Sequence, residues 1–209
     1  MSTNNIVTAG NPLKEAKKAL IMIHGRGAST ADILSLAKYL DVEDYALIAP
    51  QAANNSWYPY SFLAPLQQNE PAFSAALDQL SKTVAEVEAA GIAKDYIYFL
   101  GFSQGACLAL EFTTRNAARY GGIVAFTGGL IGDAVYPQHY NGDFEGTPIF
   151  IGTSDPDMHV PVARVYETTA ILKSKGANVT VKIYPNMAHT ISQDEIDMAN
   201  ELIFSTSIS

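Results

Sequence analysis

The stretch FLGFSQGACLAL, residues 99–110, runs from a short apolar segment, through a serine between two close glycines, into an alanine- and leucine-rich segment. Its central residues, GFSQG, fit the pattern G-x-S-x-G, which marks a sharp turn from a strand into a helix. Glycines relieve crowding in such a turn and leave Ser103 exposed at the helix N-terminus, where backbone N–H groups favour negative charge. The alternative is a serine that only caps the helix. The strand and helix on either side favour a reactive serine.

Short apolar runs alternate with longer amphipathic stretches on both sides of this turn. That alternation is typical of βαβ units, and it predicts an α/β fold with a mostly parallel, doubly wound sheet and helices on both faces. The 209 residues suit a single domain spanning 1–209. The expected strands are 19–24, 45–50, 96–102, 122–127, 148–153 and 179–185, and the expected helices are 31–40, 73–91, 104–121, 162–176 and 191–204.

Composition and charge exclude several classes of protein. The net charge is −8 and no Lys/Arg-rich run occurs, which argues against nucleic-acid binding. No segment approaches the roughly 18 consecutive apolar residues of a membrane span, so no stable membrane insertion is expected. The one cysteine, Cys107, precludes an intrachain disulfide, and the first residues lack the pattern of a secretion signal. These features favour a cytoplasmic location, and we expect Cys107 to be a small buried residue.

A serine hydroxyl is a weak nucleophile until a base takes its proton and a carboxylate orients that base. On a doubly wound sheet the order is serine, acid, histidine, each after a later strand. Of the four histidines, His24 precedes the serine, His139 lies in a long loop, and His159 lies too close to the candidate acids. His189 follows the last expected strand, which makes it the candidate base.

The loop after the strand at 148–153 offers two candidate acids, Asp155 and Asp157. Either could instead be a turn or helix-capping aspartate, and the residue pattern alone leaves the choice open. The backbone N–H of Gln104, directly after the serine, is one expected donor to an oxyanion. The second is the N–H of Arg26 in HGRGAS, residues 24–29. That loop lacks the lysine and glycine spacing of a phosphate site.

Two long loops, 56–71 and 131–148, exceed simple connections, and long loops in compact domains are often functional. From the first we expect Trp57, Tyr58 and Phe62 to line a substrate pocket, with ordinary aromatic packing as the alternative. Met187, beside His189, is another candidate for the pocket wall. An apolar patch on either loop could also support a homodimer.

Four segments in order resemble the phospholipase/carboxylesterase family of small α/β-hydrolases, which includes the acyl-protein thioesterases. They are HGRGAS, GFSQGACLAL, SDPDMHVP and YPNMAHTIS, and the resemblance runs from about residue 18 to the C-terminus. The segment with the acids looks about two residues longer than in the eukaryotic thioesterases. Arg26 stands where an apolar residue is common. WYPYSFLAP, residues 57–65, is more similar to the bacterial carboxylesterases.

The resemblance implies the α/β-hydrolase fold and a catalytic triad of Ser103, Asp157 and His189, with oxyanion donors at Arg26 and Gln104. It selects Asp157 because the family's acid precedes a Val-Pro pair by a few residues. The implied activity is hydrolysis of small-molecule carboxylic esters of short to medium acyl chain through an acyl-enzyme, without metal or organic cofactor. The alternatives are a lysophospholipase or acyl-protein thioesterase, and a non-catalytic binding protein of the same fold.

Overall fold

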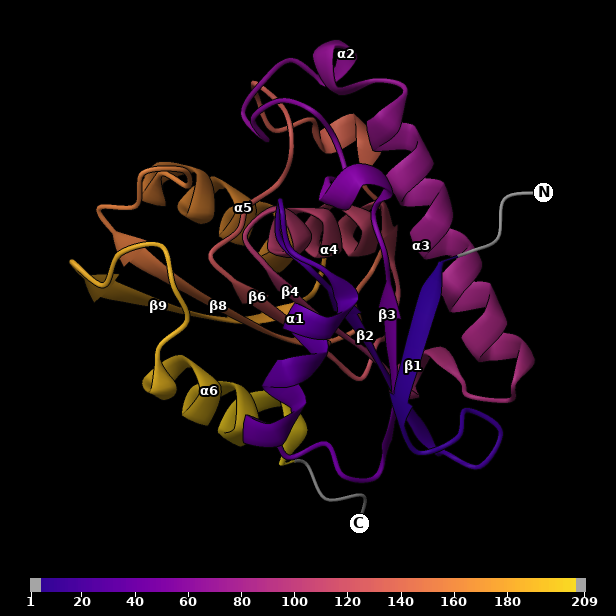
Figure 1. Ribbon diagram of the computed structural model, residues 1–209. Helices are drawn as coiled ribbons and strands as arrows, with labels where there is room; N and C mark the ends of the chain where they lie inside the picture. Colours follow the sequence, from indigo (N-terminus) through magenta and orange to yellow (C-terminus); the bar gives the residue numbers. More distant parts are fainter. Residues whose placement is uncertain (1–4, 206–209) are drawn as a thin grey trace.

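The computed structural model describes residues 5–205, which are built around a twisted sheet (Figure 1). Within these residues, seven strands form the main sheet in the order β1-β3-β2-β4-β6-β8-β9. All neighbours are parallel except β1 and β3. The strands are β1 (Ile6–Gly10), β2 (Lys18–Ile23), β3 (Tyr45–Pro50), β4 (Ile97–Phe102), β6 (Gly122–Phe126), β8 (Pro148–Asp155) and β9 (Asn178–Pro185); the short β5 (Asn116–Ala117) and β7 (Asn141–Gly142) pair separately.

The six predicted strands are confirmed to within two residues at each end. They are recognisable because the central strands of a parallel sheet are buried on both faces and so consist of continuous apolar runs. β1 was not predicted. It is an antiparallel edge strand of five residues, exposed over most of its length, so it lacks that apolar signature.

Helices cover both faces of the sheet, as predicted. Figure 1 shows α1 and α6 on one side and α3, α4 and α5 on the other, and the two apolar cores divide in the same way. The helices are α1 (Thr30–Leu34), α2 (Leu66–Asn69), α3 (Ala72–Ala89), α4 (Gln104–Arg115), α5 (Val162–Ser174) and α6 (Gln193–Ala199). The 3-10 turns are η1 (Ser35–Tyr39), η2 (Ala53–Asn55), η3 (Lys94–Tyr96) and η4 (Pro137–His139), and α6 continues as a π-helical turn, η5 (Asn200–Phe204).

The helix after the serine is shorter than predicted. α4 ends at Arg115 instead of continuing to residue 121. Asn116 leaves helical geometry, with φ −122° and ψ 45°, and its side-chain amide donates to the Phe112 carbonyl at 2.9 Å. The chain then pairs with β7 through Asn116 and Ala117. A side-chain amide that satisfies a terminal carbonyl ends this helix without the glycine that usually signals such an end.

α4 is the central helix of the larger core. Its residues from Gln104 to Thr114 are all buried, and it packs between β4 and α3. This placement fixes the turn at Ser103 rigidly against the sheet. Among the described residues, no helix combines the length and apolar character needed to cross a bilayer.

Candidate active site

Ser103 occupies a strained turn between β4 and α4. Its φ of 54° and ψ of −118° are rarely adopted by a residue with a side chain. Two glycines make the turn sterically possible. A Cβ on Gly101 would lie 2.4 Å from the carbonyl carbon of Gly105, and a Cβ on Gly105 would lie 2.0 Å from the carbonyl oxygen of Ile23. Backbone strain that the surrounding structure supports is a frequent property of functional sites.

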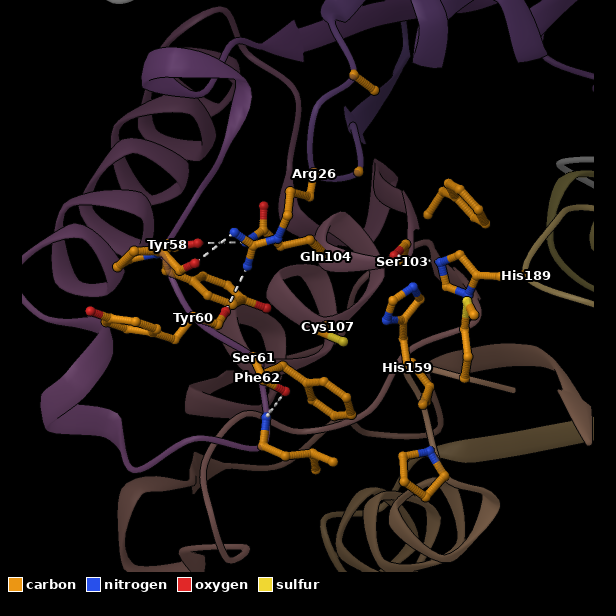
Figure 2. Close-up of a pocket in the computed structure, with 18 residues that line it drawn as sticks. Arg26, Tyr58, Tyr60, Ser61, Phe62, Ser103, Gln104, Cys107, His159 and His189 are labelled. Carbon is orange, nitrogen blue, oxygen red and sulfur yellow. Dashed lines mark hydrogen bonds between the residues drawn. The ribbon is translucent and has the colours of Figure 1, made fainter. Parts of the chain in front are cut away.

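The structure brings Ser103, His189 and Asp157 into one hydrogen-bonded chain. His189 Nε2 lies 2.8 Å from Ser103 Oγ, and His189 Nδ1 lies 2.8 Å from Asp157 Oδ2. Figure 2 shows the imidazole of His189 facing Ser103. The three residues follow β4, β8 and β9, whose carboxyl ends meet at one edge of the sheet. The arrangement can move a proton from the hydroxyl to the imidazole while a carboxylate supports the resulting charge.

Asp157, and not Asp155, is bonded to His189. The Asp157 side chain is fully buried, and its Oδ1 accepts hydrogen bonds from the backbone N–H groups of His159 and Val160, both at 2.8 Å. Burial acts to raise the pKa of this carboxyl, but the bonds from His159, His189 and Val160 outweigh it and hold the pKa below its ordinary value. Asp157 is therefore ionised at neutral pH. Asp155 ends β8 and is exposed.

The His189 ring lies between two other rings. Phe102 is tilted against it with centroids 5.2 Å apart, and His159 meets it edge-to-face at 4.9 Å. His159 also lines the pocket in front of Ser103 (Figure 2). His159 was not expected at the site, because it lies too close in sequence to the candidate acids to be the base. Its position depends on the turn at Asp157, which no sequence pattern specifies.

Arg26 lies in the loop between β2 and α1, and Gln104, directly after Ser103, is the first residue of α4. The preceding residue, Gly25, packs against the turn, because a Cβ on it would lie 3.6 Å from the Cβ of Ser103. Within residues 5–205, the backbone N–H groups of Arg26 and Gln104 have no hydrogen-bond acceptor. Both groups can therefore donate to an oxygen that develops negative charge beside Ser103.

A pocket of about 760 Å³ opens in front of Ser103. Of the predicted wall residues, Tyr58 and Phe62 line it. Trp57 and Met187, both among the described residues, lie outside its lining, contrary to the expectation. The lining residues are Gly25, Arg26, Ala28, Tyr58, Pro59, Tyr60, Ser61, Phe62, Leu63, Phe102, Ser103, Gln104, Cys107, Met158, His159, Val160, Pro161 and His189.

Trp57 packs behind the pocket instead of lining it. Its indole N–H donates to the His24 carbonyl at 2.9 Å, and the two rings lie 5.1 Å apart. His24 is itself fully buried, accepts a hydrogen bond at Nε2 from the N–H of Ala52, and has its pKa lowered by burial. Packing was the alternative for Trp57, and aromatic identity alone does not separate the two roles.

Cys107 lines the pocket one turn into α4 and is buried. Burial raises the pKa of its thiol to about 12, so the thiol stays protonated and unreactive at neutral pH. Among residues 5–205, no three His, Cys, Asp or Glu side chains are arranged to hold a metal ion.

Comparison with known proteins reveals one family across nearly the whole chain. The phospholipase/carboxylesterase family model matches residues 4–207. Acyl-protein thioesterase 1 of Saccharomyces cerevisiae is 30% identical over 210 residues, covering 88% of this chain and 91% of that protein. A probable SOBER1-like carboxylesterase of Arabidopsis thaliana is 25% identical, covering 87% and 76%.

A solved structure has a higher sequence identity to this chain than these two relatives. The crystal structure of a phospholipase/carboxylesterase from Dyadobacter fermentans is 56% identical, with a TM-score of 0.96 and coverage of 97% of each chain. The family model and this structure both match nearly the whole chain. The chain belongs to the phospholipase/carboxylesterase family and is a hydrolase of the α/β-hydrolase fold.

Proposed function

We propose that this protein hydrolyses carboxylic esters of short to medium acyl chain with Ser103 as nucleophile, His189 as general base and Asp157 as the acid that orients it. The observation that carries the proposal is the hydrogen-bonded chain from Ser103 Oγ through His189 to Asp157, with both contacts at 2.8 Å. The ionised, buried Asp157 holds the proton of neutral His189 on Nδ1, which leaves Nε2 free to accept the serine proton.

In the first half of the reaction, Ser103 Oγ attacks the acyl carbonyl carbon and its proton passes to His189 Nε2. The carbonyl oxygen becomes negatively charged and accepts hydrogen bonds from the N–H groups of Arg26 and Gln104. Each such donor stabilises the transition state by about 3 kcal/mol. The C–O bond to the alcohol then breaks, and His189 gives its proton to the departing oxygen.

In the second half, water attacks the acyl-serine. His189 Nε2 takes a proton from the water, the same two N–H groups receive the oxyanion, and the proton returns to Ser103 Oγ as the carboxylic acid leaves. The strained turn supports this cycle because it places the hydroxyl at the helix N-terminus, where it lines the pocket.

The pocket supports the substrate class. Its volume of about 760 Å³ falls within the usual range for small-molecule sites. Phe62, Leu63 and Val160 supply apolar wall for an acyl chain, and we assign Tyr58 and Phe62 to substrate binding.

Thioester hydrolysis is the second candidate, because the named yeast relative is an acyl-protein thioesterase. A thioester offers the same carbonyl to Ser103, and only the leaving group differs. For a lysophospholipase, the substrate would again be an ester, but with a different polar group. Both alternatives predict faster turnover of long acyl chains than of short ones.

The test is release of p-nitrophenol from esters of increasing acyl length, with the wild type beside Ser103→Ala. We expect a burst and steady turnover from the wild type, highest for short to medium chains, and neither from the variant. Faster turnover of a sixteen-carbon than of a four-carbon ester would favour the lipid-chain alternatives. Equal inactivity of both proteins on every ester would favour the non-catalytic binding protein.

We further propose that the chain is a single cooperative domain in the cytoplasm, with its long loops available for a homodimer contact. For the single domain we expect one thermal transition. For the location we expect recovery in the cytosolic fraction, and for the homodimer a mass of two chains by light scattering. Two separate transitions, recovery outside the cytosol, or a purely monomeric mass would each overturn the corresponding statement.

A further inference from the structure

The segment 58–63 forms one wall of the pocket without belonging to a helix or strand. Its backbone polar groups therefore need partners from elsewhere. Three successive carbonyls, those of Tyr58, Pro59 and Tyr60, accept hydrogen bonds from side chains of other segments. The position of this wall thus depends on a few side chains.

Arg26 holds two of these carbonyls. Its Nη1 donates to the Pro59 carbonyl at 2.8 Å and to Ser56 Oγ at 3.0 Å, and its Nη2 donates to the Tyr60 carbonyl at 2.6 Å. Figure 2 shows the guanidinium group directed at this segment, and its carbon lies 5.9 Å from the centre of the Tyr58 ring. All three acceptors are neutral, so the contact is a clamp on the backbone and not an ion pair.

Gln104 holds the same segment from the buried side. Its Oε1 accepts from the Trp57 N–H at 3.0 Å, and its Nε2 donates to the Tyr58 carbonyl at 2.9 Å. Arg26 and Gln104 therefore each have two roles near the active site, one for the backbone and one for the side chain. Their backbone N–H groups lie beside Ser103, and their side chains hold the pocket wall.

We propose that the Arg26 side chain is a positioning residue that sets the depth of the acyl pocket by fixing Tyr58, Tyr60 and Phe62 relative to the oxyanion donors. This inference rests on the proposed esterase function. From the sequence alone, Arg26 was unusual only because an apolar residue is common at this position. In the structure, its side chain joins the pocket wall to the loop that carries an oxyanion donor.

The clamp predicts how specificity changes when it is removed. Without the guanidinium, the Pro59 and Tyr60 carbonyls turn to water and the wall moves outward. A short acyl chain then loses contacts, whereas a longer chain gains room. The backbone N–H of Arg26 remains, so KM for the short ester rises more than kcat falls.

The experiment measures kcat and KM for four-carbon and twelve-carbon p-nitrophenyl esters in Arg26→Met, which matches the side-chain length but has no donors. We expect the ratio of kcat/KM for the long over the short ester to rise by about fivefold or more. Arg119→Met is the matched control, because Arg119 also donates to a backbone carbonyl, that of Glu145, but lies outside the pocket lining. Its ratio should equal that of the wild type.

Hydrogen exchange of the amides in 57–63 gives a second readout that does not need activity. Exchange should accelerate in Arg26→Met and not in Arg119→Met. Arg26→Lys keeps the charge without the planar fork, and we expect it to behave like Arg26→Met. If Arg26→Lys kept both the wild-type ratio of kcat/KM and the wild-type exchange in 57–63, a positive charge alone would suffice. That result would overturn the clamp.

The outcomes separate the two proposals. A wild type inactive on every ester defeats the proposed function, while exchange in 57–63 still tests the clamp. An active wild type whose Arg26→Met variant keeps the same length profile and the same exchange overturns the inference. A uniform loss of kcat on both esters with unchanged exchange also overturns it, since Arg26 would then act only at the oxyanion.

Discussion

Gly105 packs so tightly against Ile23 that a Cβ on this glycine would lie 2.0 Å from the Ile23 carbonyl oxygen. The contact joins the start of α4 to the end of β2. It therefore fixes Ser103 relative to the loop that carries Arg26. The geometry of the proposed oxyanion hole depends on this close approach of two backbone segments.

Gly105→Ala should consequently unfold easily or fail to fold. The new methyl group meets backbone that cannot yield, and we expect a loss of about 3 kcal/mol in the free energy of unfolding, measured by urea denaturation. Gly91→Ala is the control. Gly91 lies in the turn after α3 and has a φ of 99°, but a Cβ there would meet nothing within 4 Å, so only about 1 kcal/mol of backbone strain is expected. Equal losses in the two variants would contradict this account.

Replacing Ser103 separates strain from chemistry. Both Ser103→Ala and Ser103→Gly remove the hydroxyl, so both should lose the burst with ester substrates. Only glycine relieves the backbone at φ 54° and ψ −118°, so Ser103→Gly should be more stable than Ser103→Ala by about 1 kcal/mol. Calorimetric Tm values check this, and a less stable glycine variant would show that the turn is not strained.

Asp157→Asn should lower kcat by about 10³- to 10⁴-fold, because a neutral amide neither holds the required tautomer of His189 nor stabilises its protonated form. Asp155→Asn is the matched control, since Asp155 is a nearby exposed aspartate on the same segment. We expect it to retain nearly full activity in the same ester assay. A larger loss from Asp155→Asn than from Asp157→Asn would exchange their assigned roles.

His24 predicts a pH dependence of stability. Burial lowers its pKa in the folded protein, so between that pKa and the ordinary value of about 6.5 the unfolded chain binds more protons. The contribution of His24 is therefore complete above about pH 6.5 and declines as pH falls, by at most about 1.4 kcal/mol per pH unit. His24→Gln should cost more stability at pH 8 than near pH 5.5. Denaturation of both proteins across this range checks the sign, and an opposite trend would contradict it.

The Cys107 thiol should resist alkylation in the folded protein. Burial raises its pKa to about 12, which leaves almost no thiolate near neutral pH. Iodoacetamide should label the chain only in denaturant, as followed by intact mass. Rapid labelling of the native protein would contradict the burial of the thiol and its raised pKa.

The sequence predicted most of the sheet and the order of the site residues along the chain. The central strands could be found because burial on both faces demands continuous apolar runs, and the turn at Ser103 could be found because its glycines leave a distinct pattern. The edge strand β1 and the end of α4 could not be found from the sequence. β1 is largely exposed and so lacks an apolar run, and α4 ends because the side chain of Asn116 bonds to a terminal carbonyl.

The pocket wall was the least predictable part. His159 and Met158 reach it because Asp157 accepts two backbone N–H groups and turns the chain, a geometry that no residue pattern specifies. Trp57 and Tyr58 are adjacent aromatics, yet one packs on His24 and the other lines the pocket. Only the path of the irregular segment decides between them.

The most direct test of the central claim is to locate a covalent adduct after treatment with a fluorophosphonate, which captures an activated serine. We expect the wild type to gain the mass of one phosphonyl group, mapped by peptide sequencing to Ser103, and both Ser103→Ala and His189→Ala to remain unmodified. An adduct on another residue, or no adduct in the folded wild type, would contradict the assignment of Ser103 as a nucleophile activated by His189.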